Sequence, residues 1–213
     1  MFDRIVGNER ARAVLLRMLA QRRVPGALIF AGEEGVGKFE FAIELARALN
    51  CRTPRGIEGC GVCSACKRIP NFAPPPTNKD DFGKNISWSD HPDVALVRTE
   101  KAVVTVTQAR IVERESNFRP QEGSARVFII EEADKLNDAS GNALLKTLEE
   151  MPPTAHLVLL TARPASLLPT IRSRCQLVRF APLTAGEIEE YLVQTKQRAG
   201  AEARLAARLA EGL

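Results

Sequence analysis

Four of the five cysteines stand close together, as Cys51, Cys60, Cys63 and Cys66, with eight, two and two residues between them. Two overlapping Cys-x-x-Cys units can bring three thiolates to one tight knuckle, and Cys51 can close a tetrahedron around a metal ion. Four thiolates leave no coordination position open for catalysis, so the spacing predicts a structural Zn²⁺ site. A redox pair and an iron–sulfur cluster are the alternatives. Cys175 lies far away in the sequence, on an apolar segment, and is interpreted as a packed core thiol.

The segment 32–38 has the spacing of a phosphate-binding loop, with Gly32, Gly35 and Gly37 followed by Lys38. It lies between a short apolar run at 27–31, typical of a buried strand, and a helical pattern at 38–49. Backbone N–H groups at the start of a helix, together with a lysine, can bind phosphate groups. The loop is therefore interpreted as a nucleotide-binding loop, and the alternative is a plain glycine turn with an unrelated lysine.

Both expected Mg²⁺ ligands of such a site are altered. The residue after Lys38 normally carries a hydroxyl that binds the metal, but here it is Phe39. The apolar run 127–130 resembles a Walker B strand, yet Glu131 replaces the usual aspartate, and its extra methylene displaces the carboxylate by about one bond length. Glu132 keeps the position of the catalytic base. ATP hydrolysis by this chain alone is therefore not expected, and ATP and Mg²⁺ are doubtful cofactors. The alternative is that both glutamates only solvate the end of a strand.

Two more polar residues stand where nucleotide chemistry could use them. Arg174 follows the buried strand expected at 156–160 and a short helical turn, and it precedes the strand expected at 176–180. A guanidinium at such an edge could stabilise the terminal phosphate of a nucleotide on an adjacent subunit, and the alternative is a surface salt bridge. Thr161, at the tip of a strand, could contact nucleotide or water, or could simply end the strand.

The predicted elements alternate between strands and helices. Strands are expected at 27–31, 94–97, 126–130, 156–160 and 176–180, with helices at 38–49, 107–118 and 138–150. This alternation predicts a three-layer α/β fold with a parallel sheet. Asn8 is expected to cap a first helix, and Thr107 to open the helix at 107–118. Residues 73–90, with a Pro-Pro-Pro run and few aliphatic side chains, are expected to form an exposed insertion.

A change of pattern near residue 182 predicts a second unit. After Pro182 the chain continues at helical period without further strand candidates. We therefore expect residues 1–181 to form a nucleotide-binding-type domain that carries the cysteine knuckle at 51–66. Residues 182–213 are expected to form the start of a small helical lid domain, incomplete at Leu213.

Composition restricts the class of protein only mildly. The 213 residues are 45% apolar and 26% charged, enough for a sizeable core, and 30 basic against 26 acidic residues give a net charge of +4. This small excess is not the charge of a dedicated nucleic-acid binder. The sequence shows no secretory signal pattern and no apolar run long enough to span a membrane. A cytoplasmic location is expected, where reduced cysteines favour metal binding over disulfides.

Taken together, these motifs resemble the clamp-loader subunits of bacterial DNA polymerase III, which are AAA+ proteins. Beyond the phosphate loop and the four cysteines, the resemblance rests on segments 5–9, 91–93, 132–136, 142–152 and 173–175. It covers nearly the whole chain. The Ser-Arg-Cys element at 173–175 combined with the inserted cysteine knuckle is specific to this group.

The resemblance implies a role in DNA replication. Two subunit types share these features, the gamma or tau ATPase and the delta-prime subunit, and Phe39 and Glu131 favour the delta-prime type. Such a subunit would join a ring that loads the sliding clamp on primed DNA within the DNA polymerase III holoenzyme. Its partners would be the gamma/tau and delta subunits, with the clamp and primer–template DNA contacted through the ring, and no membrane. Arg174 would act in trans on a neighbour's ATP.

Two rival hypotheses remain open at the level of sequence. The chain could be an active gamma/tau-like ATPase that tolerates the changes at Phe39 and Glu131. It could also be a zinc-ribbon nucleic-acid module on an inert α/β scaffold, although the knuckle has basic residues and no aromatic side chain before Phe72.

Overall fold

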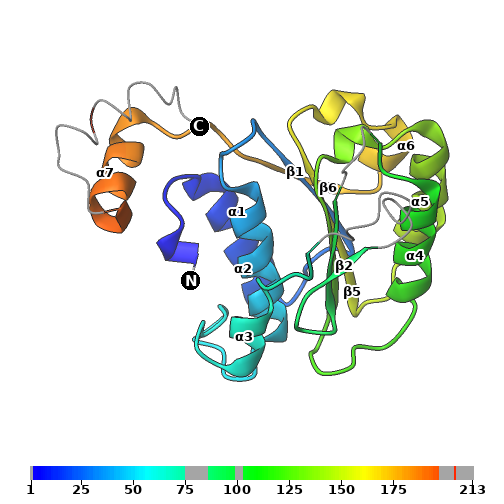
Figure 1. Cartoon of the computed structure of the whole chain (residues 1–213), viewed down its shortest axis with the longest axis horizontal. Helices are drawn as coiled ribbons and strands as arrows, with labels where there is room; N and C mark the ends of the chain where they lie inside the picture. The colour runs from blue at the N-terminus through cyan, green and yellow to red at the C-terminus, as the bar shows by residue number, and fades with distance from the viewer. Residues whose placement is uncertain (1, 75–85, 99–102, 197–203, 205–213) are drawn as a thin grey trace.

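The structure, a computed structural model, describes residues 2–74, 86–98, 103–196 and 204 (Figure 1). Within these residues six strands form one sheet in the order β2-β3-β4-β5-β1-β6. Neighbouring strands are parallel except for β2 and β3, which are antiparallel. The strands are β1 (Ala27–Ala31), β2 (Ser87–Trp88), β3 (Val94–Val97), β4 (Arg126–Ile130), β5 (Ala155–Thr161) and β6 (Gln176–Arg179).

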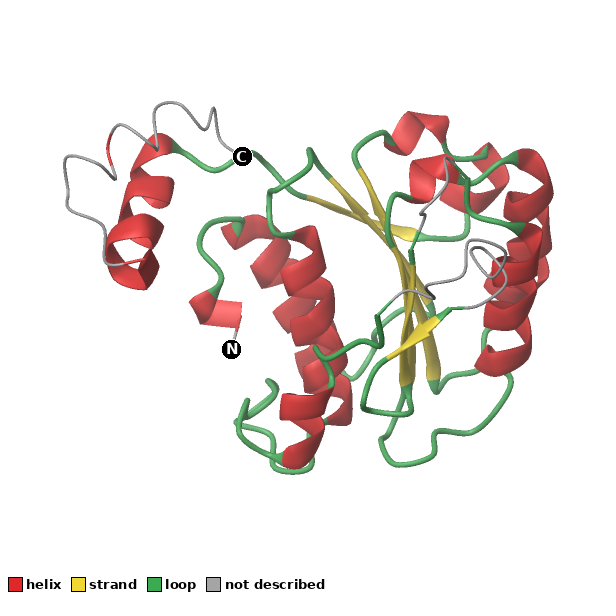
Figure 2. Ribbon diagram, viewed as in Figure 1, coloured by secondary structure: helices red, strands yellow, loops and turns green. Residues whose placement is uncertain are grey.

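Helices cover both faces of the sheet and make a three-layer architecture (Figure 2). One face carries α1 (Glu9–Ala20) and α2 (Lys38–Asn50), with α3 (Ser64–Arg68) beside the end of α2. The other face carries α4 (Val106–Ser116), α5 (Asp138–Glu149) and α6 (Pro169–Arg172), and α7 (Ala185–Lys196) lies beyond α1 (Figure 1). Short 3-10 helices are η1 (Phe2–Arg4), η3 (Ala133–Lys135) and η4 (Pro164–Ser166).

The core is divided by the sheet into two apolar clusters. One lies beneath α1 and α2 and the other beneath α4 and α5. Every residue of β1, β3, β4 and β5 is buried, because helices cover both faces of these strands. This explains why the central strands are continuous apolar runs in the sequence. Because β1, β4 and β5 run parallel, their carboxyl ends lie at the same edge of the sheet, where the phosphate loop begins.

Most of the predicted elements are confirmed within one or two residues, but the two predicted helix caps need correction. The predicted helix at 107–118 begins earlier, at Val106, and its N-cap is Thr105, not Thr107. Thr105 and Gln108 form a reciprocal capping box, which satisfies two N–H groups at the helix start. Asn8 does stand at the N-cap of α1, yet its side chain makes no capping hydrogen bond.

The expectation of an exposed insertion at 73–90 is wrong for its last part. Ser87–Trp88 pairs with β3 as an antiparallel edge strand, and the Trp88 ring packs 6.3 Å from that of Phe128. A tight turn from Ser89 to Val94 joins the two strands, and a turn this short can connect only antiparallel strands. The sheet is therefore not wholly parallel. Residues 75–85 lie outside the described residues.

The predicted change of character after residue 181 coincides with the end of the sheet. β6 ends at Arg179, and α7 begins at Ala185. Of the remainder of the expected lid, only Arg204 is described beyond α7, so the domain boundary near 182 stays a prediction. Among the described helices, none combines the length and apolarity that a membrane span requires.

Candidate nucleotide site and metal centre

The phosphate loop connects β1 to α2 as the sequence predicts. Gly37 has a φ of 90°, a left-handed conformation that a side chain disfavours, and directly precedes Lys38 at the start of the helix. Gly32 allows close approach, because a Cβ there would lie 2.6 Å from the Phe180 carbonyl oxygen. The Lys38 Nζ donates to the carbonyl oxygens of Gly32, at 2.7 Å, and Glu33. Burial lowers the pKa of Lys38.

A cavity of about 420 Å³ lies beside this loop, at the carboxyl ends of β4 and β5. Seven of the residues singled out from the sequence line it together with Asp134; the seven are Gly35, Gly37, Lys38, Phe39, Glu131, Glu132 and Thr161. The structure thus brings the loop, the Walker B-like strand end and the strand-tip threonine to one site. Gly32 is not among the lining residues, but its carbonyl oxygen accepts a hydrogen bond from the Nζ of Lys38.

The structure places Phe39 and Glu131, the two residues that the sequence puts at the expected Mg²⁺ positions, at the same cavity. Phe39 presents a ring, which packs 6.2 Å from the ring of Phe72, and has no oxygen to offer a metal. The Glu131 Oε2 lies 3.4 Å from the Nε of Arg98, a residue that directly follows β3. Burial raises the pKa of Glu131 although Arg98 opposes the rise. Of these two positions, therefore, Phe39 offers no oxygen and the Glu131 carboxylate is paired with Arg98.

Glu132, at the position of a catalytic base, lies at the edge of the same cavity. Its backbone is left-handed, with a φ of 47°, and it begins the 3-10 helix η3. The Glu132 Oε1 is 2.7 Å from the Nζ of Lys135, so the carboxylate is held by an ion pair with its own turn. A strained backbone at the end of a Walker B-like strand is typical of a functional site.

A polar network that the sequence did not reveal joins Thr161 to two further residues. The Thr161 hydroxyl donates to the Asp134 Oδ1 at 3.0 Å, and Arg163 donates to the Oδ2 from its Nε at 3.1 Å and its Nη2 at 2.7 Å. Burial alone would raise the pKa of Asp134, but the bonds from Arg163 and Thr161 hold it below its usual value. Asp134 belongs to the 132–136 motif, which could have indicated it.

Asn8 links the phosphate loop to the connection that follows β6. Its Nδ2 donates to the carbonyl oxygens of Val36, at 3.0 Å, and Ala181, at 3.2 Å, and its Oδ1 accepts from the Ala181 N–H at 2.7 Å. The residue has a φ of 56°, a conformation that asparagine tolerates better than most residues. These bonds replace the helix cap that the sequence predicts.

Arg174 lies away from the cavity, just beyond α6. Its Nη2 is 2.6 Å from the Glu149 Oε1 and its Nη1 donates to the Thr170 carbonyl oxygen at 3.0 Å. About 36% of its side-chain surface remains exposed, so the guanidinium is held by two partners and still accessible. The neighbouring Cys175 packs against the core beneath α5, and burial raises its pKa to about 12, as befits an inert thiol.

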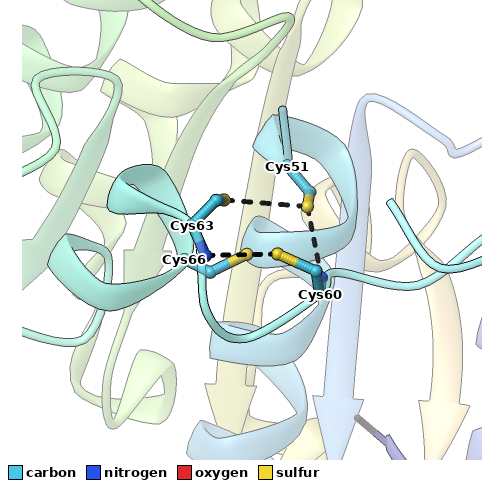
Figure 3. Close-up of side chains that lie close together, drawn as sticks. All are labelled: Cys51, Cys60, Cys63 and Cys66. Carbon is cyan, nitrogen blue, oxygen red and sulfur yellow. Dashed lines mark hydrogen bonds between the residues drawn. The ribbon is translucent and has the colours of Figure 1, made fainter. Parts of the chain in front are cut away.

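The four clustered cysteines converge on one point (Figure 3). Cys51 follows α2, Cys60 and Cys63 lie in the loop after it, and Cys66 is on α3. Their four sulfur atoms all lie within 4.8 Å of one another, and the Cys51 and Cys63 sulfurs are 3.9 Å apart. Zinc–sulfur bonds in a tetrahedron place the sulfurs roughly 3.8 Å apart, so the arrangement fits a closed, four-coordinate metal ion.

The surroundings favour the thiolate form at two of the four sulfurs, those of Cys60 and Cys63, and burial disfavours it at Cys51 and Cys66. The Thr53 hydroxyl, aided by backbone N–H groups, lowers the pKa of Cys60 to about 5. The backbone N–H of Cys60 donates to the Cys51 sulfur and that of Cys63 to the Cys60 sulfur, each at 3.2 Å. Cys66 is buried, which raises its pKa. Donors that aim at the sulfurs orient them and stabilise their charge before a metal arrives.

Comparison with known proteins identifies the family. The family described as DNA polymerase III, delta subunit, matches residues 7–78 and 76–184. The chain belongs to this family. Its members are replication proteins, and the clamp-loader resemblance seen in the sequence is thereby confirmed at the level of the family.

Relatives of this family come from several bacteria. DNA polymerase III subunit delta′ of Bacillus subtilis is 31% identical over 87% of the chain and 51% of that protein. Subunit tau of Bacillus subtilis is 32% identical over 88% of the chain and 30% of that protein, and subunit tau of Escherichia coli is 32% identical over 99% and 31%. The chain thus spans about half or less of the length of these relatives.

Solved structures confirm the AAA+ fold. A DNA polymerase III gamma subunit-related protein of Thermotoga maritima has a TM-score of 0.55 at 19% identity, covering 93% of the chain and 57% of that protein. The RuvB Holliday junction branch migration motor of the same organism has a TM-score of 0.57 at 16% identity, covering 95% and 56%. At this identity the likeness concerns the fold alone.

Proposed function

We propose that the chain is a delta-prime-type subunit of the bacterial clamp loader, which helps to load the sliding clamp on primed DNA without hydrolysing ATP itself. Its working partners in this proposal are the gamma/tau ATPase and delta subunits, and it reaches the clamp and primer–template DNA through the assembled ring. A cytoplasmic location follows from that role and stays a prediction.

The observation that carries the proposal is the state of the metal-binding positions. Phe39 offers no oxygen, and Glu131 faces the guanidinium of Arg98 at 3.4 Å. Mg²⁺ demands oxygen ligands at about 2.0–2.1 Å in near-ideal octahedral geometry, so a carboxylate displaced by one methylene and drawn toward an arginine is a poor ligand. Lys38 is also engaged with its own loop. These contacts support a nucleotide site that no longer positions a metal for hydrolysis.

Arg174 is the proposed contribution to a neighbour's chemistry. It lies outside the cavity of its own chain, and its guanidinium is exposed while Glu149 and Thr170 hold its orientation. A positioned arginine that reaches the phosphates of an adjacent subunit stabilises the charge of the transition state and accelerates phosphoryl transfer about 10³-fold or more. In the same proposal the four cysteines hold a structural Zn²⁺, whose closed coordination keeps the knuckle folded.

The test compares two arginines in the assembled ring. We would combine the full-length protein with its partner ATPases and measure DNA-stimulated ATP turnover for Arg174→Ala and, as a control, Arg172→Ala, an exposed arginine two residues earlier in the chain. Arg174→Ala should remove the turnover contributed by the neighbouring site, whereas Arg172→Ala should leave it near the wild-type rate. Equal rates for both variants and the wild type would rule out the trans role.

An active gamma/tau-type ATPase is the second candidate, because the tau relatives are as similar to the chain as delta′ and because Lys38 and Glu132 are retained. The isolated chain distinguishes the two candidates. Mg²⁺-dependent hydrolysis that disappears in Lys38→Ala would establish the second candidate, and absence of hydrolysis in both proteins is expected from the first.

A further inference from the structure

A groove of about 300 Å³ lies on the α6 side of the sheet, at the outermost strand β6. Its floor is formed by Ile29 of β1 and Leu177 of β6, which are paired across the two strands and face the same side of the sheet. The other lining residues are Pro164 and Ala165 of η4, Arg172 of α6 and Arg179 of β6. None of the six lines the nucleotide cavity or belongs to the cysteine cluster.

The helical layer on this side does not fully cover the end of the sheet. Only 1% of Ile29 is exposed, whereas 39% of Leu177 is exposed although the two residues are neighbours. Val178, on the opposite face of β6, is 2% exposed because it packs in the core cluster beneath α1 and α2. One face of β6 is therefore buried in the core, and the other presents an apolar side chain to the surface.

The free edge of β6 also offers backbone hydrogen-bonding groups. β6 pairs with β1 on one side and is the last strand of the sheet on the other. The N–H of Phe180, directly after β6, donates to the Ala31 carbonyl oxygen at 2.7 Å, so Phe180 and Val178 direct their backbone groups toward β1. Because these groups alternate in direction along a strand, those of Leu177 and Arg179 point away from the sheet, where no strand among the described residues pairs with them. Such an edge is a template for another strand.

Two arginines give the groove a positive charge. Arg172 and Arg179 are both exposed, and neither forms an ion pair with another described residue. No acidic residue lines the groove. A guanidinium fork suits a carboxylate or a phosphate. The floor of the groove is aliphatic, however, and its lining includes no aromatic ring on which a nucleic-acid base could stack. A protein segment that carries a carboxylate therefore fits the groove better than a nucleic acid.

We propose that β6 pairs with an extended segment of a partner protein in which one residue separates an apolar residue from an acidic residue. Leu177 and Arg179 are two residues apart and face the same side, so the residues opposite them on an added strand are also two apart. The apolar side chain covers Leu177, and the carboxylate pairs with Arg179 beside Arg172. Backbone hydrogen bonds supply affinity, and the two side chains supply selectivity. The proposal does not depend on the clamp-loader role of the chain.

The experiment measures the fluorescence anisotropy of labelled peptides mixed with the full-length protein at fixed salt. The probe peptide, Thr-Glu-Thr-Val-Thr-Glu-Thr, carries the proposed spacing in both directions. Its isomer, Thr-Thr-Glu-Val-Glu-Thr-Thr, places valine and glutamate on opposite faces of a strand. The probe should bind about fivefold more tightly than the isomer, and more tightly than the same peptide with lysine in place of glutamate. N-methylation of the amides of the probe should abolish binding, because the added strand then cannot donate to β6.

Two variants of the chain locate the binding site. Arg179→Glu replaces attraction by repulsion and should weaken binding of the probe about fivefold, whereas the matched control Arg110→Glu, an exposed arginine on α4, should leave it unchanged. Leu177→Thr keeps a strand-forming residue and should weaken binding a few-fold.

Four results overturn the proposal: no binding of the probe, equal binding of the probe and its isomer, equal binding to Arg179→Glu and Arg110→Glu, or undiminished binding of the N-methylated probe. An oligo-dT strand that binds in an Arg179-dependent manner, where the probe does not, assigns the groove to nucleic acid and overturns it equally.

Discussion

Asn8 offers a sensitive probe of how the phosphate loop is connected to the rest of the chain. Asn8→Ala removes three hydrogen bonds, one to the loop at Val36 and two to Ala181. Each contributes about 0.5–1.5 kcal/mol, and the two bonds to Ala181 are exposed, so about 2 kcal/mol in total is expected. Alanine must also adopt a φ near 56°, which costs about 1 kcal/mol more.

The free energy of unfolding should therefore fall by about 3 kcal/mol in Asn8→Ala, which corresponds to a decrease in Tm of roughly 6–12 °C for a chain of this size. Asn8→Gly loses the same bonds without the backbone strain and should cost about 1 kcal/mol less. Urea unfolding followed by circular dichroism measures both. Asn142→Ala, an exposed asparagine on α5, is the control and should stay within about 0.5 kcal/mol of the wild type.

A local measurement separates this mechanism from general destabilisation. The Ala181 amide donates to the Asn8 Oδ1 at 2.7 Å, so its hydrogen exchange should accelerate in both Asn8 variants and not in Asn142→Ala. If Asn8→Ala unfolds at the same urea concentration as Asn142→Ala, or if the Ala181 amide exchanges as slowly as in the wild type, the assigned link between loop and connection is wrong.

Three further predictions concern the metal positions, the cysteine cluster and acid stability. Phe39→Thr combined with Glu131→Asp should create Mg²⁺-dependent ATP binding, because the shorter carboxylate withdraws by about one bond length from Arg98. Calorimetry with and without EDTA measures this. If EDTA does not weaken ATP binding to the double variant, the prediction is wrong. Purified protein should contain about one zinc per chain by elemental analysis. Cys63→Ser should lose the metal and several kcal/mol of stability in thermal unfolding, whereas the control Cys175→Ser should keep both. Burial lowers the pKa of His156, so the unfolded chain binds a proton that the folded chain excludes. The contribution of His156 to the free energy of unfolding should therefore be fully present above about pH 6.5 and should decline below it, by up to about 1.4 kcal/mol per pH unit. In His156→Gln, Tm should fall less steeply as the pH is lowered than it does in the wild type.

A structural feature could be predicted from the sequence where neighbouring residues determine it, and could not where it depends on residues far apart in the chain. The central strands were predictable because β1, β4 and β5 are buried on both faces and must be apolar throughout. The edge strand β2 was missed, because two residues of a polar segment acquire strand structure only by pairing with β3. The ion pair between Arg98 and Glu131 could not be predicted, because nothing in the local sequence of Arg98 indicates that its side chain lies near Glu131.

The sequence by itself determined which chemistry the chain can carry. The spacing of four cysteines, the loop that ends in Lys38, and the absence of a hydroxyl group at Phe39 are matters of residue type and short-range order. The tertiary structure alone decided which distant groups meet, such as Thr161 with Asp134 and Arg163, or Arg126 with Trp88. These contacts depend on strand order and on the direction of each side chain, and both are set by packing across the whole sheet, which no local pattern encodes.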